Sequence, residues 1–159
     1  METVEMQNEV FLPQVVALIN EGHNVTITAR GSSMMPFIHD GRDSLIFAKI
    51  EDKVRVGDAV LAEVSKGVFV CHRIVEINGS KVTLRGDGNI RGTESCTVED
   101  VKALLVGVVR NGKTIILKKS KAWHVYSVLW PRLLPIRRYL LALYRLVVMH
   151  KLPQRWQRK

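Results

Sequence analysis

The sequence predicts a mainly β protein, a mostly antiparallel sheet of about five to eight short strands, with a short helix before it and amphipathic helices after it. Short apolar runs of strand length succeed one another between residues 24 and 118. Asn-Gly pairs at 78–79 and 111–112 each separate two such runs, and this dipeptide is a strong signal for a β-hairpin. From Ser120 onward the apolar spacing becomes helical.

The first two predicted elements lead toward a pair of serines. A helix is expected over residues 7–21, because its apolar residues recur at helical spacing and Gly22 follows as a stop signal. Residues 24–30 then alternate between apolar and polar side chains, which is typical of a half-buried strand. This strand would deliver Ser33 at its carboxyl end.

The other predicted strands are apolar runs bounded by turn residues. Gly57-Asp58 is expected to form a turn between two buried strands. The two Asn-Gly pairs are expected to close hairpins. These further strands are predicted at residues 45–47, 59–61, 68–77, 81–85, 104–109 and 114–117.

Two helices are predicted near the C-terminus, over residues 120–130 and 136–150, because Pro131 and Pro135 interrupt the helical spacing. In the second helix, two arginines seven residues apart share one side, next to a wide apolar surface. The C-terminal part is therefore expected to be amphipathic.

Charge is unevenly distributed along the chain. Residues 1–109 hold 11 Lys and Arg against 15 Asp and Glu, whereas residues 110–159 hold 13 Lys and Arg and no acidic residue. The length of 159 residues suits one domain with an appendage. The predicted units are a helical N-terminal segment (1–23), a β domain (24–118) and a basic helical tail (119–159).

Neither a membrane anchor nor a cofactor is expected. The N-terminus is acidic and lacks the basic-then-apolar layout of a secretion signal. No stretch reaches the roughly 18 to 20 apolar residues that cross a bilayer. We therefore expect a cytoplasmic protein that can also bind peripherally at the membrane surface. Cys71 and Cys96 lack the partner spacing of a zinc site, and no metal is expected.

Three roles are open to the basic tail, residues 120–159. Its Trp, Tyr, Lys and Arg residues suit a membrane interface, which we rank first. Packing of its apolar side on the β body ranks second. Nucleic acid ranks a distant third, since no base-reading helix is evident and an apolar stripe would not contact phosphate.

A serine, a histidine and an aspartate follow strand-like runs in chain order, at Ser33, His72 and Asp87. A serine hydroxyl is a weak nucleophile near neutral pH, so an adjacent base must take its proton. Histidine titrates in the right range for this task, and a carboxylate behind it fixes its tautomer. The pattern favours acyl-transfer chemistry, most simply the hydrolysis of a peptide bond.

The local motifs resemble those of the type I signal peptidase superfamily, which includes the self-cleaving repressors of the SOS and phage type. Four blocks occur in the family order over roughly residues 25–118, and they read Gly-Ser-Ser-Met-Met-Pro, Val-Gly-Asp, His-Arg-Ile-Val and Gly-Asp-Gly-Asn. Where most bacterial members use lysine as the base, His72-Arg73 is similar to the histidine subtype of endoplasmic-reticulum and archaeal members. The resemblance implies a coiled, barrel-like antiparallel sheet.

The resemblance implies that Ser33 is the nucleophile, His72 the base and Asp87 the residue that orients His72. Backbone groups of Gly31 and Ser33 would form the oxyanion hole, because a glycine stands where some members carry an assisting hydroxyl. Thr93 stands where the subtype has a second aspartate, and a glutamate follows it.

Each of these residues also has a structural interpretation. Ser32 and Ser33 are alternatively turn serines, His72 a hydrogen-bonded core histidine, and Asp87 part of an Asp-Gly turn. Lys66 and Lys81 are rival bases that lie outside the family position, and His39 is expected at the surface.

The resemblance also implies a substrate peptide that pairs with a strand edge while small side chains enter shallow pockets. Val25–Ala29 or Leu45–Lys49 could supply that edge. Met34, Met35 and Pro36 are expected to line the substrate site, although core packing explains Met35 equally well.

We therefore expect a serine endopeptidase that cleaves a leader-like or signal-like peptide with small residues before the cut. One alternative is a self-cleaving regulator of the repressor type, although too few residues precede Val25 for a DNA-binding domain and the matching lysine is missing. Another is a catalytically inactive peptide-binding module.

Overall fold

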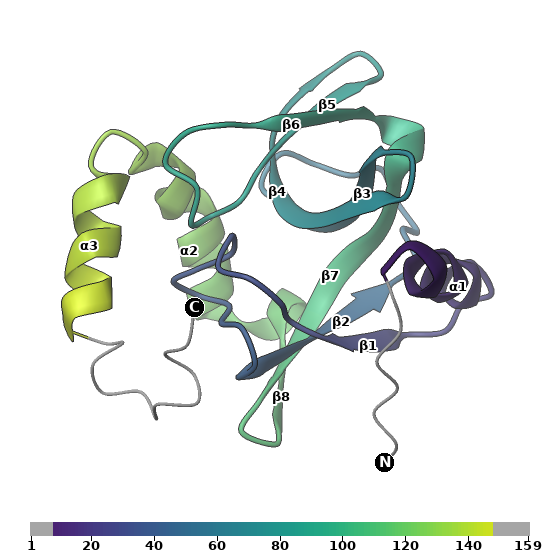
Figure 1. The fold of residues 1–159 in the computed structure, drawn as a ribbon, viewed down its shortest axis with the longest axis horizontal. Coiled ribbons are helices and arrows are strands. Elements are labelled where there is room, and N and C mark those ends of the chain that lie inside the picture. The colour runs from purple at the N-terminus through teal and green to yellow at the C-terminus, as the bar shows by residue number, and fades with distance from the viewer. Residues whose placement is uncertain (1–7, 148–159) are drawn as a thin grey trace.

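The computed structural model describes residues 8–147, with side chains from residue 11 onward. Within this part, eight antiparallel strands form one coiled sheet in the order β1-β2-β7-β3-β4-β5-β6, with β8 paired to β7 (Figure 1). The terminal strands β1 and β6 do not pair with each other, so the sheet does not close into a barrel. The mainly β class predicted from the sequence is confirmed. The strands are β1 (Val25–Thr28), β2 (Asp43–Ala48), β3 (Ala59–Ser65), β4 (Val68–Asn78), β5 (Lys81–Arg85), β6 (Glu94–Thr97), β7 (Val101–Arg110) and β8 (Lys113–Ile116).

Helices lie at two ends of the sheet. Helix α1 (Asn8–Asn20) packs beside β1, while α2 (Lys121–Arg132) and α3 (Arg137–Val147) lie at the opposite end of the long axis (Figure 1). Short 3₁₀ turns, η1 (Val98–Asp100) and η2 (Leu117–Lys119), flank β7 and β8. No helix of the described residues is long and apolar enough to span a bilayer.

Strand β7 joins the two halves of the sheet. Its N-terminal part pairs with β3 and its C-terminal part with β2 and β8. Alternate residues of β2 are buried, so Leu45 and Phe47 enter a core that α1, β7 and α2 also line. A second core cluster around Val60, Ile74 and Leu84 lies beneath β3, β4 and β5. Residues at the end of β1 and at the start of β4 line one pocket at the side of the first core.

The Asn-Gly hairpin between β7 and β8 forms as predicted. Arg110 pairs with Lys113, so Asn111 and Gly112 alone make the loop. Their φ angles are +51° and +73°, and a type I′ turn requires positive φ at both positions. Asparagine tolerates this conformation better than other residues with a side chain, which explains the local sequence.

The C-terminal helices differ from the prediction at Pro131. The sequence predicts a break there, but α2 continues through Pro131 to Arg132. Pro131 lies in the last turn of α2, so the backbone donor that it lacks and the clash of its ring with the preceding turn affect only the end of the helix. Helix α3 confirms the second predicted helix up to Val147, and residues 148–150 of that prediction lie outside the described residues.

Candidate active site

Ser33 lies in a tight turn just after β1. Gly31 has a φ of +82°, which favours glycine, and the Met35 amide donates to the carbonyl of Ser32 over 3.2 Å. Ser33 itself is half-buried. In the described residues, no hydrogen-bond partner is found for its hydroxyl or its backbone N–H. Both groups are thus available to a ligand.

Two glycines hold the Ser33 turn from behind. The Gly88 amide donates to the Ser33 carbonyl over 2.7 Å. A Cβ on Gly86 would lie 2.4 Å from that carbonyl oxygen, and a Cβ on Gly88 would lie 2.5 Å from the Ser32 carbonyl oxygen. The Gly-Asp-Gly segment therefore needs glycines because two backbones touch, a reason that the sequence analysis did not identify.

His72 is buried on β4 and is held by a carboxylate. Its Nδ1 lies 2.9 Å from Oε2 of Glu94, whose side chain is 33% exposed. Alternate residues of a strand share a face, so His72 lies on the face of Ile74. Ile74 pairs with Leu84, and Leu84 pairs with Glu94. The sheet register therefore brings Glu94 toward the imidazole from two strands away.

The expectation that Asp87 orients His72 does not hold. Both carboxylate oxygens of Asp87 accept hydrogen bonds from Arg73, over 2.9 Å from Nε and 2.7 Å from Nη2. The hydroxyl of Tyr126 donates to the same carboxylate over 2.9 Å. Arg73 follows His72 on the strand, so its side chain points to the opposite face. Asp87 therefore neutralises the charge of the buried arginine, and Glu94 is the carboxylate that contacts the histidine.

The Arg73–Asp87 pair also anchors helix α2. Nη1 of Arg73 donates to Ser127 Oγ over 2.8 Å, and the Trp130 indole donates to the Asp87 carbonyl over 2.8 Å. Burial opposes the charge of Arg73, but the hydrogen bonds and charge of Asp87 outweigh it and raise the pKa of the guanidinium. Burial, followed by the charge of Asp87, raises the pKa of Tyr126. Helix α2 therefore packs on the β body, which is the role of the tail that ranked second from the sequence.

Ser33 and His72 line one pocket of about 240 Å³, although they lie 39 positions apart in the chain. Helix α1, the end of β1 and the start of β4 also contribute, and most of the lining is apolar. Leu12, Ile27, Met34, Phe47, Phe69 and Cys71 are among the lining residues.

Cys71 is a rival nucleophile in the same pocket. Burial, with a smaller contribution from the charge of Asp87, raises the pKa of its thiol to about 12. The thiol is therefore protonated near neutral pH, and a protonated thiol is a poor nucleophile. Cys71 therefore acts in this pocket as a small apolar residue.

The other residues predicted for the site are spread around the Ser33 turn. The Gly31 amide donates to Asp40 Oδ2 over 3.2 Å, so it is engaged away from an oxyanion. Met34 is buried and lines the pocket, whereas Met35 is buried outside the pocket lining. Pro36 also lies outside that lining, and its carbonyl lies 3.0 Å from His39 Nε2.

His39 is buried, contrary to the surface position expected from sequence. Its Nε2 also contacts the Tyr144 hydroxyl of α3. Burial lowers the pKa of His39, and the nearby charge of Arg42 lowers it further. His39 therefore joins α3 to the loop that follows Ser33.

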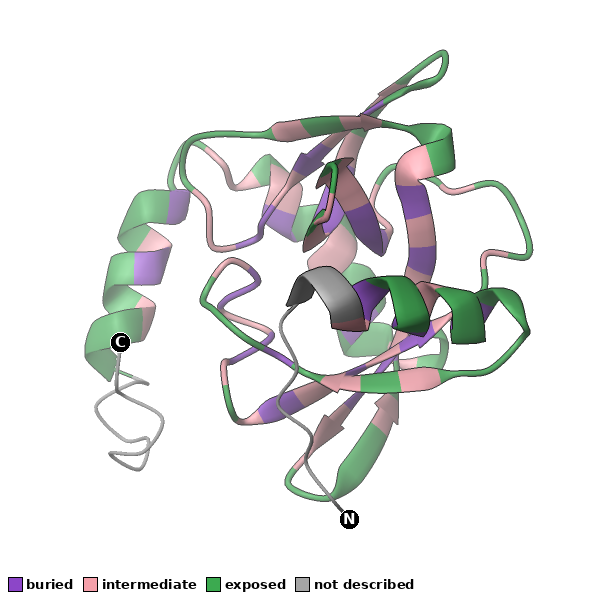
Figure 2. Cartoon of the chain, turned by 45° about the vertical axis from the view of Figure 1, so that its right-hand side comes forward, coloured by how far each residue is buried: buried purple, intermediate pink, exposed green. Residues whose placement is uncertain are grey.

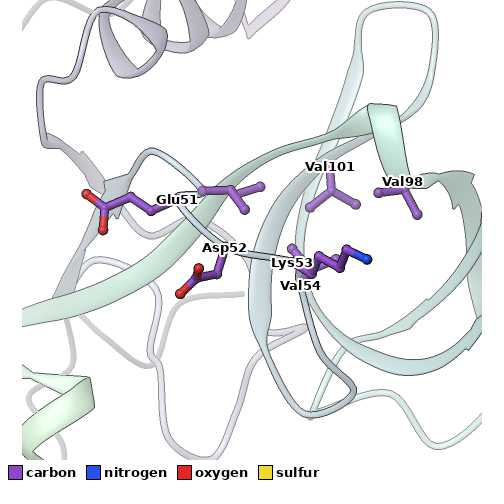
Figure 3. A pocket seen from close by; sticks show the side chains of 7 residues that line it. Glu51, Asp52, Lys53, Val54, Val98 and Val101 are labelled. Atoms are coloured by element: carbon purple, nitrogen blue, oxygen red, sulfur yellow. The ribbon is translucent and has the colours of Figure 1, made fainter.

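A second, more open pocket of about 540 Å³ lies on another part of the surface (Figure 3). Loop residues 50–54 line it together with Val98 and Val101. It shares no residue with the pocket of Ser33 and His72. It offers two carboxylates and one lysine but no histidine, serine or cysteine, so the proposed chemistry does not belong there.

A serine peptidase needs a serine hydroxyl within reach of a histidine that a carboxylate holds. Here a half-buried serine on a tight turn and a histidine held by a carboxylate line the same pocket. The comparison with protein families agrees with this class. The profile described as Peptidase S24-like matches residues 2–109, more than half of the chain, and the chain belongs to that family. The match includes Ser33, His72 and Glu94 and ends before β8. A search of curated proteins finds no match.

Membership of the Peptidase S24-like family confirms the superfamily that the sequence motifs resemble. It also supports serine peptidase activity as a general class. Sequence reasoning missed Glu94 as the partner of His72, because β6 is too polar to be recognised as a strand. The signal that could have identified Glu94 was its position directly after Thr93, which stands where the histidine subtype has a second aspartate.

Proposed function

We propose that the protein is a serine endopeptidase in which Ser33 attacks, His72 acts as base and then acid, and Glu94 orients His72. The observation that supports this best is the 2.9 Å contact between His72 Nδ1 and Glu94 Oε2 at a pocket that Ser33 also lines. Asp87 has no part in the proton transfer.

The contact with Glu94 favours the tautomer in which Nδ1 carries the proton and Nε2 is free to accept one. Nε2 then takes the Ser33 hydroxyl proton as Oγ bonds to the substrate carbonyl carbon. Glu94 stabilises the imidazolium that forms. Nε2 next gives its proton to the leaving amine, the C–N bond breaks, and water hydrolyses the acyl-enzyme by the same route.

The backbone N–H of Ser33 is the oxyanion donor that remains free in the described residues. A single preorganised donor of this kind is typically worth about 3 kcal/mol of transition-state stabilisation. Gly88 contributes indirectly, because its amide fixes the Ser33 carbonyl and thereby the plane of the turn.

The substrate is proposed to bind as an extended peptide between β1 and β4. Strand β1 pairs only with β2, so its outer edge has no strand partner in the described sheet. Residues 68–72 of β4 pair with β3 but precede the segment that pairs with β5. Two open edges thus border the pocket, as β-augmentation requires.

The second edge suggested from sequence, Leu45–Lys49, is not available. Strand β2 lies between β1 and β7 and pairs with both. A small apolar side chain of the substrate would enter the pocket beside Met34 and Phe69. The leader-like or signal-like nature of the substrate rests on the resemblance to histidine-type signal peptidases.

A self-cleaving regulator is the second candidate. It is favoured by Leu12, because this residue of α1 lines the pocket and places a segment of the same chain near the candidate nucleophile. Incubation of the pure chain over a range of dilutions separates the two candidates. Cleavage at a dilution-independent rate favours the self-cleaving regulator, and cleavage of added peptides alone favours the endopeptidase.

The decisive experiment labels the purified chain with a fluorophosphonate and follows its cleavage of a mixed peptide library by mass spectrometry. Ser33→Ala is expected to abolish both signals. Ser32→Ala is the matched control, since it removes an exposed hydroxyl one residue away and should retain both. Equal labelling and cleavage by the wild type and Ser33→Ala would refute the proposed nucleophile.

A further inference from the structure

Helix α3 has two unlike faces. On its inner side, Arg137 and Leu141 are only 2% and 3% exposed. On its outer side, Tyr139, Leu143 and Leu146 are 59%, 59% and 69% exposed, and they recur at the spacing of a single helix face. Figure 2 shows the exposed positions of α3 directed away from the sheet. We call Tyr139, Leu143 and Leu146, together with Ile136 just before the helix, the outer face of α3.

The inner side holds α3 in a defined orientation. The Arg137 guanidinium donates to the Trp130 carbonyl over 2.9 Å and to the Asn89 carbonyl over 3.3 Å. Tyr144 contacts His39. These anchors use residues on the side of the helix opposite the outer face. The exposed apolar side chains are therefore a fixed surface of a folded helix.

Positive charge borders the outer face. Arg138 and Arg145 are exposed and seven residues apart, so they form one edge of the helix beside Tyr139. No acidic residue occurs in residues 110–159, which carry 13 Lys and Arg. A second copy of the chain would bring the same positive charge to the contact and would be repelled.

We propose that the outer face of α3 binds the interface of an anionic lipid membrane. The apolar side chains would enter the boundary between headgroups and acyl chains, Tyr139 would lie at headgroup level, and the arginines would meet lipid phosphates. Each basic residue near such a surface contributes attraction that salt screens. Nucleic acid fits less well, because phosphate gives the apolar residues no partner.

The position of this face has a consequence for catalysis, and this step alone rests on the proposed function. Arg137 bonds to Asn89, which adjoins the Gly88 amide that holds Ser33. Tyr144 contacts the loop that follows Ser33. Docking through α3 would therefore place the bilayer against the helix whose inner side contacts both the segment behind Ser33 and the loop that follows it.

The test uses the full-length chain with Ser33→Ala, so binding is measured whether or not the protein is a peptidase. Sedimentation with vesicles of phosphatidylcholine is compared with vesicles that also contain phosphatidylglycerol. We expect binding to the anionic vesicles and a loss of about tenfold or more in affinity in Leu143→Gln/Leu146→Gln. The matched control, Val56→Gln/Val68→Gln, changes two exposed apolar residues elsewhere and should bind like the parent.

A second variant pair tests the charge. Arg138→Gln/Arg145→Gln should weaken binding to the anionic vesicles by about tenfold and reduce its salt dependence. Arg55→Gln/Lys66→Gln removes two exposed charges elsewhere and serves as the control. Circular dichroism of each variant checks the fold.

Three outcomes would overturn the proposal. One is equal binding of the parent and Leu143→Gln/Leu146→Gln to anionic vesicles. Another is an absence of binding by the folded parent protein. The last is a concentration-dependent dimer that Leu143→Gln/Leu146→Gln dissolves, which would assign the outer face of α3 to a second copy of the chain.

Discussion

Glu94 Oε2 lies 2.9 Å from His72 Nδ1, although the two residues belong to strands that do not pair with each other. Strand β5 lies between them, and its Leu84 pairs with Ile74 on one side and with Glu94 on the other. The contact explains how a histidine in an apolar strand can keep one ring nitrogen fixed and the other free.

Glu94→Gln should lower kcat by about a hundredfold or more, because the amide no longer stabilises the imidazolium and also permits the wrong tautomer. Its free energy of unfolding should change little, since the side chain is one-third exposed. Peptide cleavage and urea unfolding of the same preparation measure both effects. Glu99→Gln, a change at an exposed glutamate nearby in sequence, is the control. An unchanged kcat in Glu94→Gln would show that Glu94 has no part in the mechanism.

Asp87→Ala should act mainly on stability. It leaves the guanidinium of Arg73 buried without its carboxylate and should lower the free energy of unfolding by about 3 kcal/mol or more. The double variant Asp87→Ala/Arg73→Met should recover part of this loss, because it removes the unpaired charge as well. Denaturant unfolding of the two variants checks the prediction. A single variant as stable as the wild type would contradict the assigned role of the pair.

Gly88→Ala should impair activity through the Ser33 turn. Its added Cβ would lie 2.5 Å from the Ser32 carbonyl oxygen, so one of the two backbones must move. Because positioning errors of about 1 Å can cost a hundredfold in rate, we expect at least a tenfold loss of kcat. Gly79→Ala is the control: it strains a turn with a φ of +59° but meets no atom within 4 Å. Similar activities of the two variants would argue against a supporting role for Gly88.

His39 should make the fold sensitive to acid. Burial lowers its pKa most, and the charges of Arg42 and Arg110 lower it further, whereas the hydrogen bond with Pro36 and the charge of Asp43 act in the opposite direction. A group whose pKa is lower in the folded than in the unfolded protein contributes its full stabilisation above the unfolded-state pKa, which is about 6.5 for histidine. This stabilisation is lost as the pH falls through the folded-state pKa.

The free energy of unfolding should therefore fall more steeply on acidification below about pH 6.5 in the wild type than in His39→Gln. Urea unfolding at a series of pH values measures both slopes. His23→Gln, which changes an exposed histidine, should follow the wild type. Parallel curves for the wild type and His39→Gln would exclude this contribution.

Local signals were sufficient for much of the fold. Asn111-Gly112 predicts its hairpin because few other dipeptides accept two positive φ angles. The helical spacing after Ser120 likewise predicts both C-terminal helices. However, α2 continues through Pro131 and ends at Arg132, because its last turn accommodates the proline. In contrast, β6 is short and polar, and only pairing with β5 defines it.

Chain order and motif indicate Ser33 and His72 as candidates, and the structure places both at one pocket, but these signals do not indicate the residues that support them. Glu94 reaches His72 through the registers of three strands, which spacing along the chain does not show. Arg73 offered an unused signal. An arginine within an apolar strand requires a buried carboxylate, and this requirement made Asp87 a candidate partner of Arg73 as well as of His72.

The bond from Trp130 to the carbonyl of Asp87 crosses the limit of the region shared with the family. Any engineered version that ends after β8, or that replaces the C-terminal helices with those of another protein, would lose this hydrogen bond. The bond holds the segment of Gly86 and Gly88 that lies behind the Ser33 turn. We therefore expect any fragment that retains the proposed activity to extend at least through α2.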